Sequence, residues 1–302
     1  MRIGLLGTGP WAQRVHAPAL AAHPDVELAG VWGRRPEAAA ELATAHGVRA
    51  FSELDELLAD VDVVSVALPP EVQAEVAVRA ARAGCHLLLD KPVATGVAQA
   101  RAVLDAAREH GVAGQVFFTL RFDPERADWI ERQAAAGGWT AGTVRWLSAV
   151  FTSGDSPYAA SPWRRTKGAL WDIGPHALSV LLPALGEVER LSAAPGEHGT
   201  VRLDLQHTGG AVGTAELSLS TPVDRAAFEV ELRNGRHSTQ LPTPGGDPVP
   251  AFGHAVDALL AAARNPADNG PCDLAFGLRV VRLLAAAEQA LATGRPVRHP
   301  EH

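Results

Sequence analysis

Short apolar runs alternate with longer helical stretches from residue 2 to about residue 118. Each run is apolar throughout, which is typical of strands buried on both faces of a parallel sheet. The predicted strands are Ile3–Leu6, Val26–Trp32, Val61–Ala67, His86–Leu89 and Ala113–Phe118, and the predicted helices are Pro36–His46, Glu71–Ala83 and Val97–His110. Repeated strand–helix–strand units predict an α/β fold, with a doubly wound parallel sheet and helices on both faces.

After Arg121 the pattern changes, because β-rich stretches now follow one another through Gly-rich turns. The stretches are Val144–Phe151, Thr200–His207, Ala211–Leu219 and Phe228–Arg233, and helices are predicted at Phe252–Arg264 and Leu274–Leu291. Consecutive strands form hairpins, so this half predicts an α+β domain with a large, mostly antiparallel sheet. Apolar and polar residues alternate from Val201 to Gln206, so one face of that sheet is expected to be polar or covered by a partner. We therefore predict two domains, residues 1–120 and 121–302.

Composition agrees with this organisation. The chain has 302 residues, of which 47% are hydrophobic and 20% charged, as is ordinary for globular domains. No apolar run approaches the ~18 residues of a membrane span, and the first residues lack the pattern of a secretory signal. Cys85 and Cys272 stand in no disulfide or metal-binding pattern. These observations predict a cytoplasmic protein without a membrane partner or a metal site.

The charged residues argue against nucleic acid as a partner. Lys and Arg total 27 against 34 acidic residues, for a net charge of −7, and the basic residues are scattered. Only two of them are lysines, Lys91 and Lys167. Because a buried lysine can release its proton and arginine cannot, a retained lysine marks a place that needs an amine, unless it survives on the surface by chance.

A glycine-rich segment follows the first predicted strand directly. It reads Gly7-Thr8-Gly9-Pro10-Trp11-Ala12 and leads into a helix. In this context the first glycine permits a tight turn, the second lets the backbone approach a pyrophosphate, and the small Ala12 allows close helix–strand packing. The helix N-terminus faces the phosphates. The segment predicts a Rossmann domain that binds a dinucleotide.

The end of the second strand bears on which dinucleotide is bound. An NAD site is expected to carry Asp or Glu there, to hydrogen-bond the ribose hydroxyls. This chain has Gly33-Arg34-Arg35 instead. Guanidinium groups pair with a 2′-phosphate, so the sequence favours NADP over NAD. The alternative is that Arg34 and Arg35 cover the adenine or lie in solvent.

Two further segments carry candidate catalytic groups. Lys91 follows the strand that ends near Asp90, and ligands of open α/β sheets bind at the carboxyl ends of strands. Farther along, Asp172 and His176 stand four residues apart at the start of an apolar helix, a spacing that places them on one face. Histidine is the usual proton-transfer group near neutral pH. Alternatively, this pair is a helix cap and a structural histidine.

In combination and order, six segments resemble the Gfo/Idh/MocA oxidoreductases, the family of glucose-fructose oxidoreductase and inositol dehydrogenase. They are GTGPWA at residues 7–12, ALPPEV at 67–72, DKP at 90–92, LRFDP at 120–124, WDIGPH at 171–176 and TGRPV at 293–297. The resemblance covers nearly the whole chain. It implies a Rossmann domain followed by a domain for substrate binding and oligomerisation. This second domain has a large sheet, whose outer face packs against another subunit in a homodimer or homotetramer. It also implies hydride exchange between a nicotinamide and a hydroxyl or carbonyl carbon.

The resemblance also implies roles for particular residues. Lys91 would bind and polarise the reacting oxygen, His176 would act as acid and base, and Asp172 would bind substrate beside it. Ala67, Leu68, Pro69, Asp90, Lys91 and Pro92 would join residues 7–12 and 33–35 at the cofactor. Arg121, in the LRFDP segment, would contact substrate.

Some positions depart from the family's pattern. Asp90 replaces the usual Glu, and Gln73 and Thr119 stand where His and Asn are common, so contacts around the nicotinamide are expected to differ. The segment before WDIGPH retains Trp163, Arg164 and Lys167, which we predict to contact substrate. A solvated basic loop is the alternative.

The sequence therefore predicts an enzyme, an NAD(P)-dependent dehydrogenase or reductase acting on a small polyhydroxylated molecule such as a sugar or cyclitol. One alternative is a non-catalytic dinucleotide-binding sensor or regulatory protein, favoured by the altered Gln73 and Thr119 but opposed by the retained Lys91, Asp172 and His176. The other is a sugar-processing enzyme that uses the nicotinamide transiently, without net cofactor turnover.

Overall fold

The computed structural model describes residues 1–235, 237–243, 245–265 and 269–300. The chain forms two compact units, Met1–Asp123 with Gly246–Leu278, and Pro124–Gly245 with Arg279–His302. The predicted boundary at residue 120 lies close to the first break, at residue 123. Residues 246–278 return to the first unit, although the sequence predicts them in the second domain. The roles predicted for the second domain, substrate binding and oligomerisation, stay predictions.

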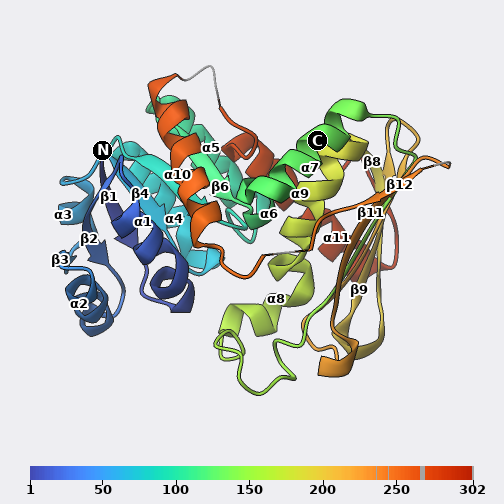
Figure 1. Cartoon of the computed structure of the whole chain (residues 1–302), viewed down its shortest axis with the longest axis horizontal. Helices are drawn as coiled ribbons and strands as arrows, with labels where there is room; N and C mark the ends of the chain where they lie inside the picture. Colours follow the sequence, from blue (N-terminus) through green and yellow to red (C-terminus); the bar gives the residue numbers. More distant parts are fainter. Residues whose placement is uncertain (236, 244, 266–268, 301–302) are drawn as a thin grey trace. The chain divides into compact units, whose positions relative to one another are not determined.

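The first unit contains a six-stranded parallel sheet (Figure 1). Its strands are β1 (Arg2–Leu6), β2 (Glu27–Trp32), β3 (Arg49–Phe51), β4 (Val63–Val66), β5 (His86–Asp90) and β6 (Gly114–Phe117). The order β3-β2-β1-β4-β5-β6 reverses direction between β1 and β4, and ligands of such sheets bind at this switch point. The predicted doubly wound sheet is confirmed; only β3, three residues long, was not predicted.

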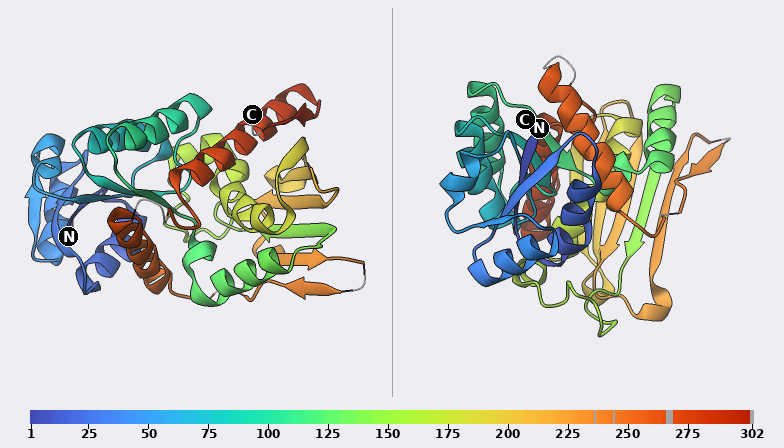
Figure 2. Two further views of the ribbon diagram at one scale, coloured as in Figure 1. Left: turned by 90° about the horizontal axis from the view of Figure 1, so that it is seen from above. Right: turned by 60° about the vertical axis from the view of Figure 1, so that its left-hand side comes forward.

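Helices cover both faces of this sheet, and Figure 2 (left) shows α5 and α10 on opposite sides of it. The helical elements of this unit are η1 (Ala12–His16), α1 (Ala17–Ala22), α2 (Pro36–Ala45), α3 (Leu54–Leu58), α4 (Pro70–Arg82), α5 (Val97–Glu109), α6 (Thr119–Phe122) and α10 (Val249–Arg264). Helix α10 contacts β5, β6 and α1. Phe252 of α10 is fully buried, with its ring edge-on to Phe117 of β6 at 4.9 Å between centroids. This apolar contact explains why α10 belongs to the first unit; periodicity identifies a helix's apolar face but not which sheet it covers.

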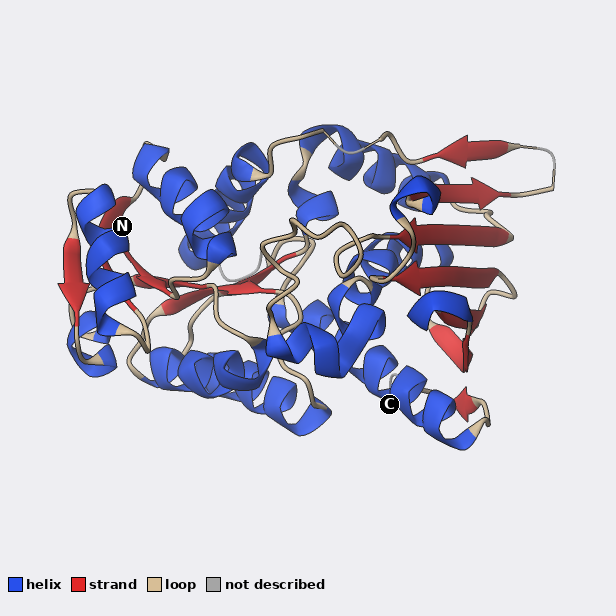
Figure 3. Cartoon of the chain, turned by 90° about the horizontal axis from the view of Figure 1, so that it is seen from below, coloured by secondary structure: helices blue, strands red, loops and turns tan. Residues whose placement is uncertain are grey.

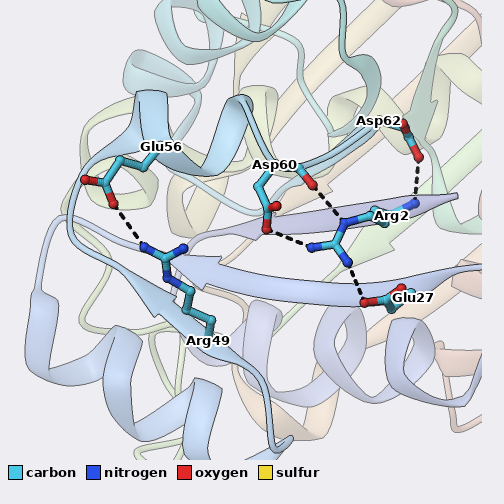
Figure 4. A network of polar contacts seen from close by, with 6 residues as sticks. All are labelled: Arg2, Glu27, Arg49, Glu56, Asp60 and Asp62. Carbon is cyan, nitrogen blue, oxygen red and sulfur yellow. Dashed lines mark hydrogen bonds and ion pairs between the residues drawn. The ribbon is translucent and has the colours of Figure 1, made fainter.

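Paired charges hold the amino ends of the strands together (Figure 4). The guanidinium of Arg2 lies 2.7 Å from carboxylate oxygens of both Glu27 and Asp60, and its backbone N–H donates to Asp62 at 2.8 Å. These contacts join β1 to β2 and to the turn before β4. The amino end of the sheet is thus fixed by charge pairs at the surface.

The second unit contains a seven-stranded sheet of order β12-β11-β7-β10-β9-β8-β13, drawn in Figure 3 as neighbouring red arrows. Its strands are β7 (Ala141–Leu147), β8 (Val188–Pro195), β9 (Val201–His207), β10 (Val212–Ser218), β11 (Ala227–Arg233), β12 (Ser238–Gln240) and β13 (Val297–Arg298). Helices α7 (Pro124–Ala136), α8 (Pro162–Asp172) and α9 (Gly174–Leu185) belong to this unit, and the division between the units falls within α11 (Leu274–Thr293).

All strand pairs of this sheet are antiparallel except β7 with β10, so the prediction of a mostly antiparallel sheet is confirmed. The hairpin predicted at residues 207–211 is present: the His207 N–H donates to the Ala211 carbonyl at 2.9 Å. Along β9, Leu203 and Leu205 are buried, whereas Arg202, Asp204 and Gln206 are exposed. The predicted alternation is therefore confirmed. No helix in the described ranges is long and apolar enough to span a membrane.

Candidate active site

The glycine-rich turn brings three strand ends together. The Gly7 N–H donates to the Trp32 carbonyl at 2.8 Å. Gly7 has φ +130°, and a Cβ there would lie 2.3 Å from the Ala67 carbonyl oxygen. Only glycine tolerates both the positive φ and this close approach. The turn therefore fixes the carboxyl ends of β1, β2 and β4 relative to one another, as the sequence predicts.

Gly9 is glycine for a different reason. A Cβ on Gly9 would meet no atom within 4 Å, so the space over this residue is open. Such space is what a pyrophosphate needs to approach the backbone. Ala12, fully buried, begins the π-helical turn η1, and the Gln13 amide donates to the Thr8 carbonyl at 3.1 Å. The fingerprint therefore leads into a helix whose first turn is π-helical.

A cavity of about 390 Å³ lies at this turn. It is lined by Gly7, Thr8, Gly9, Gly33, Arg34, Arg35, Ala67, Leu68 and Pro69, all of which the sequence predicts at the cofactor. No carboxylate lines it, and neither Arg34 nor Arg35 is ion-paired within the described ranges. Open backbone at Gly9 and two available guanidinium groups fit a dinucleotide with its phosphates. The other predicted cofactor residues, Pro10, Trp11, Ala12, Asp90, Lys91 and Pro92, are not among the lining residues.

A buried histidine lies at the end of the helical turn that follows the glycine-rich segment. His16, the last residue of η1, is fully buried, and its Nδ1 lies 2.8 Å from the Ser65 hydroxyl. The rings of Phe252 and Phe117 lie 4.1 and 6.5 Å from the imidazole. Burial lowers the pKa of His16 to about 3, so this side chain stays neutral and acts as core.

Lys91 follows the last residue of β5. It is half-buried, its backbone N–H donates to Asp90 Oδ1 at 2.9 Å, and the Lys91–Pro92 peptide bond is cis. Lys91 belongs to the first unit, as does Arg121, a buried residue of α6 whose guanidinium lies 5.7 Å from the centroid of the Phe276 ring. Lys91 thus stands at the carboxyl end of the sheet, where the sequence predicts it.

Asp172 and His176 belong to the second unit and to two different helices. Asp172 ends α8, and His176 is the third residue of α9, which Gly174 and Pro175 begin. The expectation that both stand at the start of one helix is wrong, because Pro175 lacks an N–H and its ring obstructs a continuing helix. Both residues are nevertheless buried, at 9% and 8% exposure.

Asp172 is held by an arginine from the predicted substrate segment. Arg164 Nε lies 2.9 Å from Asp172 Oδ2, and the two side chains are 19% and 11% exposed. The Arg164 guanidinium also lies 4.7 Å from the centroid of Trp163 and 4.9 Å from that of Tyr158. Rings on a guanidinium restrict its orientation and favour its charge. Of the predicted residues, the structure therefore brings Trp163, Arg164 and Asp172 together.

Lys167 has different partners from Trp163 and Arg164. Its Nζ is 2.9 Å from Glu288 and 5.1 Å from the centroid of the Trp171 ring. The alternative of a solvated basic loop is wrong, because residues 163–167 belong to α8. In addition, Lys167 is ion-paired and Trp163 is buried at 8% exposure.

His176 has an aromatic neighbour that the sequence does not predict. The Trp146 ring of β7 lies 5.3 Å from the His176 ring, inclined by 30°, and the Phe228 ring of β11 lies edge-on to Trp146 at 4.7 Å. Trp146 and Phe228 are direct cross-strand partners. Both lie in predicted strands, but a strand pattern does not say which residues face each other across neighbouring strands.

Comparison with known proteins identifies the two halves of the chain. Residues 1–118 match the model of an oxidoreductase family with an NAD-binding Rossmann fold, and residues 132–237 match the Gfo/Idh/MocA C-terminal domain. A dTDP-3,4-didehydro-2,6-dideoxy-alpha-D-glucose 3-reductase of Streptomyces violaceoruber is 36% identical over 208 residues, 67% of this chain and 59% of the relative. A UDP-N-acetylglucosamine 3-dehydrogenase of Acidithiobacillus ferrooxidans is 40% identical over 137 residues, 45% of this chain and 42% of the relative. The chain thus matches only about half the length of these two relatives.

Solved structures extend the likeness to the whole fold. The WlbA dehydrogenase of Bordetella pertussis, solved with NADH and UDP-GlcNAcA, superposes with a TM-score of 0.80 at 22% identity, covering 99% of this chain and 97% of that one. Since both family models match and together span most of the sequence, the chain belongs to the Gfo/Idh/MocA family of oxidoreductases.

Proposed function

We propose that this chain transfers a hydride between a nicotinamide cofactor and a hydroxyl or carbonyl carbon of a small polyhydroxylated substrate, a sugar or cyclitol, with NADP favoured over NAD. The observation that carries the proposal is the cavity at the glycine-rich turn, where Arg34 and Arg35 line the wall and no carboxylate does. A 2′-phosphate gains charge-assisted hydrogen bonds from a guanidinium. A carboxylate there would repel the same phosphate.

Fluorescence titration with NADPH and NADH tests the cofactor preference. We expect tighter binding of NADPH, and a loss of that preference in Arg34→Ala by about tenfold, the size of one charge-assisted hydrogen bond. Arg35→Ala shows whether the second guanidinium shares the role. Equal or tighter binding of NADH would be compatible with the proposed enzyme class but would contradict the preference for a 2′-phosphate. No binding of either dinucleotide would overturn the proposal.

Each catalytic group has a separate role in the proposal. When bound, the nicotinamide supplies the hydride acceptor or donor. The Lys91 ammonium holds the reacting oxygen, and His176 takes its proton in the oxidative direction. Asp172 binds substrate, oriented by Arg164 at 2.9 Å, while Trp163, Arg164, Lys167 and Arg121 are further substrate contacts.

The two relatives suggest where to look for the substrate. Their names place the reaction at carbon 3 of a nucleotide-linked sugar. A panel of UDP-N-acetylglucosamine, free hexoses and myo-inositol with NADP therefore covers the proposed class. On any substrate found, Lys91→Ala is expected to lower kcat by about 100-fold or more while leaving NADPH affinity intact. Near-normal turnover would remove Lys91 from the reaction.

His176 has its own test on the same substrate. A general acid and base sets the pH dependence of the rate, so His176→Ala is expected to abolish or shift that dependence. An unchanged pH profile would rule out the role.

Net cofactor turnover separates this proposal from the alternatives. A sensor would bind dinucleotide without reacting, and an enzyme that oxidises and re-reduces its substrate would show no net change in NADPH. A cytoplasmic location and a homodimer or homotetramer assembled through the sheet of the second unit complete the proposal. The assembly rests on the resemblance to the family, and analytical ultracentrifugation tests it.

A further inference from the structure

Gln73 stands where the family commonly has a histidine, and the structure gives it specific contacts. It is the fourth residue of α4 and 1% exposed. Its Nε2 lies 2.7 Å from the Asp90 carbonyl oxygen, 3.0 Å from that of Pro92 and 3.3 Å from that of Val93. Its Oε1 accepts the Asp90 N–H at 3.2 Å. One buried amide thus contacts four backbone groups at the end of β5 and in the turn that follows it.

These contacts enclose the backbone of Lys91. The Asp90 carbonyl precedes Lys91 in the chain and the Pro92 carbonyl follows it, and both accept from the same Nε2. The Lys91 N–H is held in turn by Asp90 Oδ1 at 2.9 Å. The Asp90–Lys91 peptide unit is therefore held at both its carbonyl and its N–H, and the Pro92–Val93 unit is held at its carbonyl. These contacts on either side of Lys91 restrict the direction in which its side chain leaves the backbone.

We propose that Gln73 is a positioning residue for Lys91: its side-chain amide orients the turn that presents the ammonium to the reacting oxygen. The inference rests on the proposed function, in which Lys91 binds that oxygen. A primary amide suits the task because it offers two N–H donors to the three carbonyls and one acceptor to the Asp90 N–H. Because Gln73 is buried, losing the amide removes hydrogen bonds that water does not readily replace.

The lysine content of the chain makes a direct test practical. Lys91 and Lys167 are the only two lysines, so protein labelled with ¹³C-lysine gives two ¹³Cε resonances, and Lys167→Arg assigns them. Gln73→Leu keeps the size and removes every hydrogen bond, and Gln73→Glu keeps the shape but, when ionised, removes both donors. Lys167, ion-paired to Glu288 in the second unit, serves as an internal reference.

Gln115→Leu is the matched control. Gln115 is also a fully buried glutamine of the first unit, and its Nε2 donates to the backbone carbonyl of Asn269, in a segment without predicted site residues. Its replacement removes a buried glutamine amide from β6, whose hydrogen bond does not involve the turn around Lys91. Thermal unfolding of all variants shows whether they remain folded.

We expect the Lys91 ¹³Cε resonance to shift or broaden in both Gln73 variants and to keep its position in Gln115→Leu, with Lys167 constant throughout. On a substrate from the panel, kcat should fall by about tenfold or more while the Kd for NADPH stays within about twofold, as misplacement of a catalytic group predicts. A Lys91 resonance unchanged in both Gln73 variants, or displaced equally by Gln115→Leu, would overturn the proposal. The NMR test needs neither cofactor nor substrate, so it tests the role of Gln73 by itself. An absence of dinucleotide binding in the titration would instead contradict the proposed function.

Discussion

The two ends of the six-stranded parallel sheet carry arginines in opposite situations. At the amino end, Arg2 lies between Glu27 and Asp60, each 2.7 Å away (Figure 4). At the carboxyl end, Arg34 and Arg35 line a cavity that contains no carboxylate. Carboxylates of the protein neutralise the charge of a paired arginine, and the pair holds strands together. In a cavity without acids, the positive charge of an arginine can instead attract an anionic ligand.

The largest effect is expected from Gly9→Val at the carboxyl end, which should weaken cofactor binding without lowering stability. Gly9→Val places a branched side chain in the open space over the turn, where a Cβ meets no atom within 4 Å. The folded chain accommodates it, but a pyrophosphate cannot approach, so the Kd for NADPH should rise by about 100-fold or more with little change in Tm. Fluorescence titration and thermal unfolding measure the two quantities.

Gly7→Ala is the contrasting variant, because its Cβ would lie 2.3 Å from the Ala67 carbonyl at φ +130°. It should lower Tm and binding together. Equal losses of stability in Gly7→Ala and Gly9→Val would contradict the different reasons given for the two glycines.

Mild acid is expected to destabilise the folded chain through His16. The folded chain keeps His16 neutral, with a pKa of about 3, whereas the unfolded chain protonates it below about pH 6.5. The contribution of neutral His16 to the free energy of unfolding is therefore complete above pH 6.5 and is lost as the pH falls toward 3. Between pH 7.5 and 5 the free energy of unfolding should decrease by about 2 kcal/mol through His16. Urea unfolding at each pH measures the decrease.

His16→Asn isolates this contribution, since an amide can still hydrogen-bond Ser65 but does not titrate. His86, whose pKa burial also lowers, acts in the same direction and stays in both proteins. Identical pH dependence in the wild type and His16→Asn would refute the assignment.

The smallest effect is expected at the amino end. The Arg2 side chain is 42% exposed, and its ion pairs face solvent. Arg2→Ala should lower Tm by no more than about 3 °C, less so in high salt, and should leave the Kd for NADPH unchanged. Differential scanning calorimetry at two ionic strengths checks this, and a weakened affinity for NADPH would show that the two ends are coupled.

Much of the cofactor site follows from local sequence. Gly7, Gly9 and Gly33 adjoin predicted strands, and the rule for open α/β sheets places strand ends at the ligand. Nine of the predicted cofactor residues line one cavity because the ends of β1, β2 and β4 are neighbours in the sheet. Asp172 and His176 show the limit of this reasoning, since their spacing suggested one helix whereas Pro175 separates two.

The sequence by itself determined the elements and their periodicity: the buried parallel strands, the alternating β9, the hairpin after His207 and the fingerprint at the end of β1. These depend on residues close together in the chain. Only the tertiary structure decided that α10 packs on the first sheet, that Trp146 lies against His176 and that Gln73 holds the turn around Lys91. Each of these contacts joins residues distant in sequence, and their partners are selected by complementary packing and hydrogen bonding that no local pattern encodes.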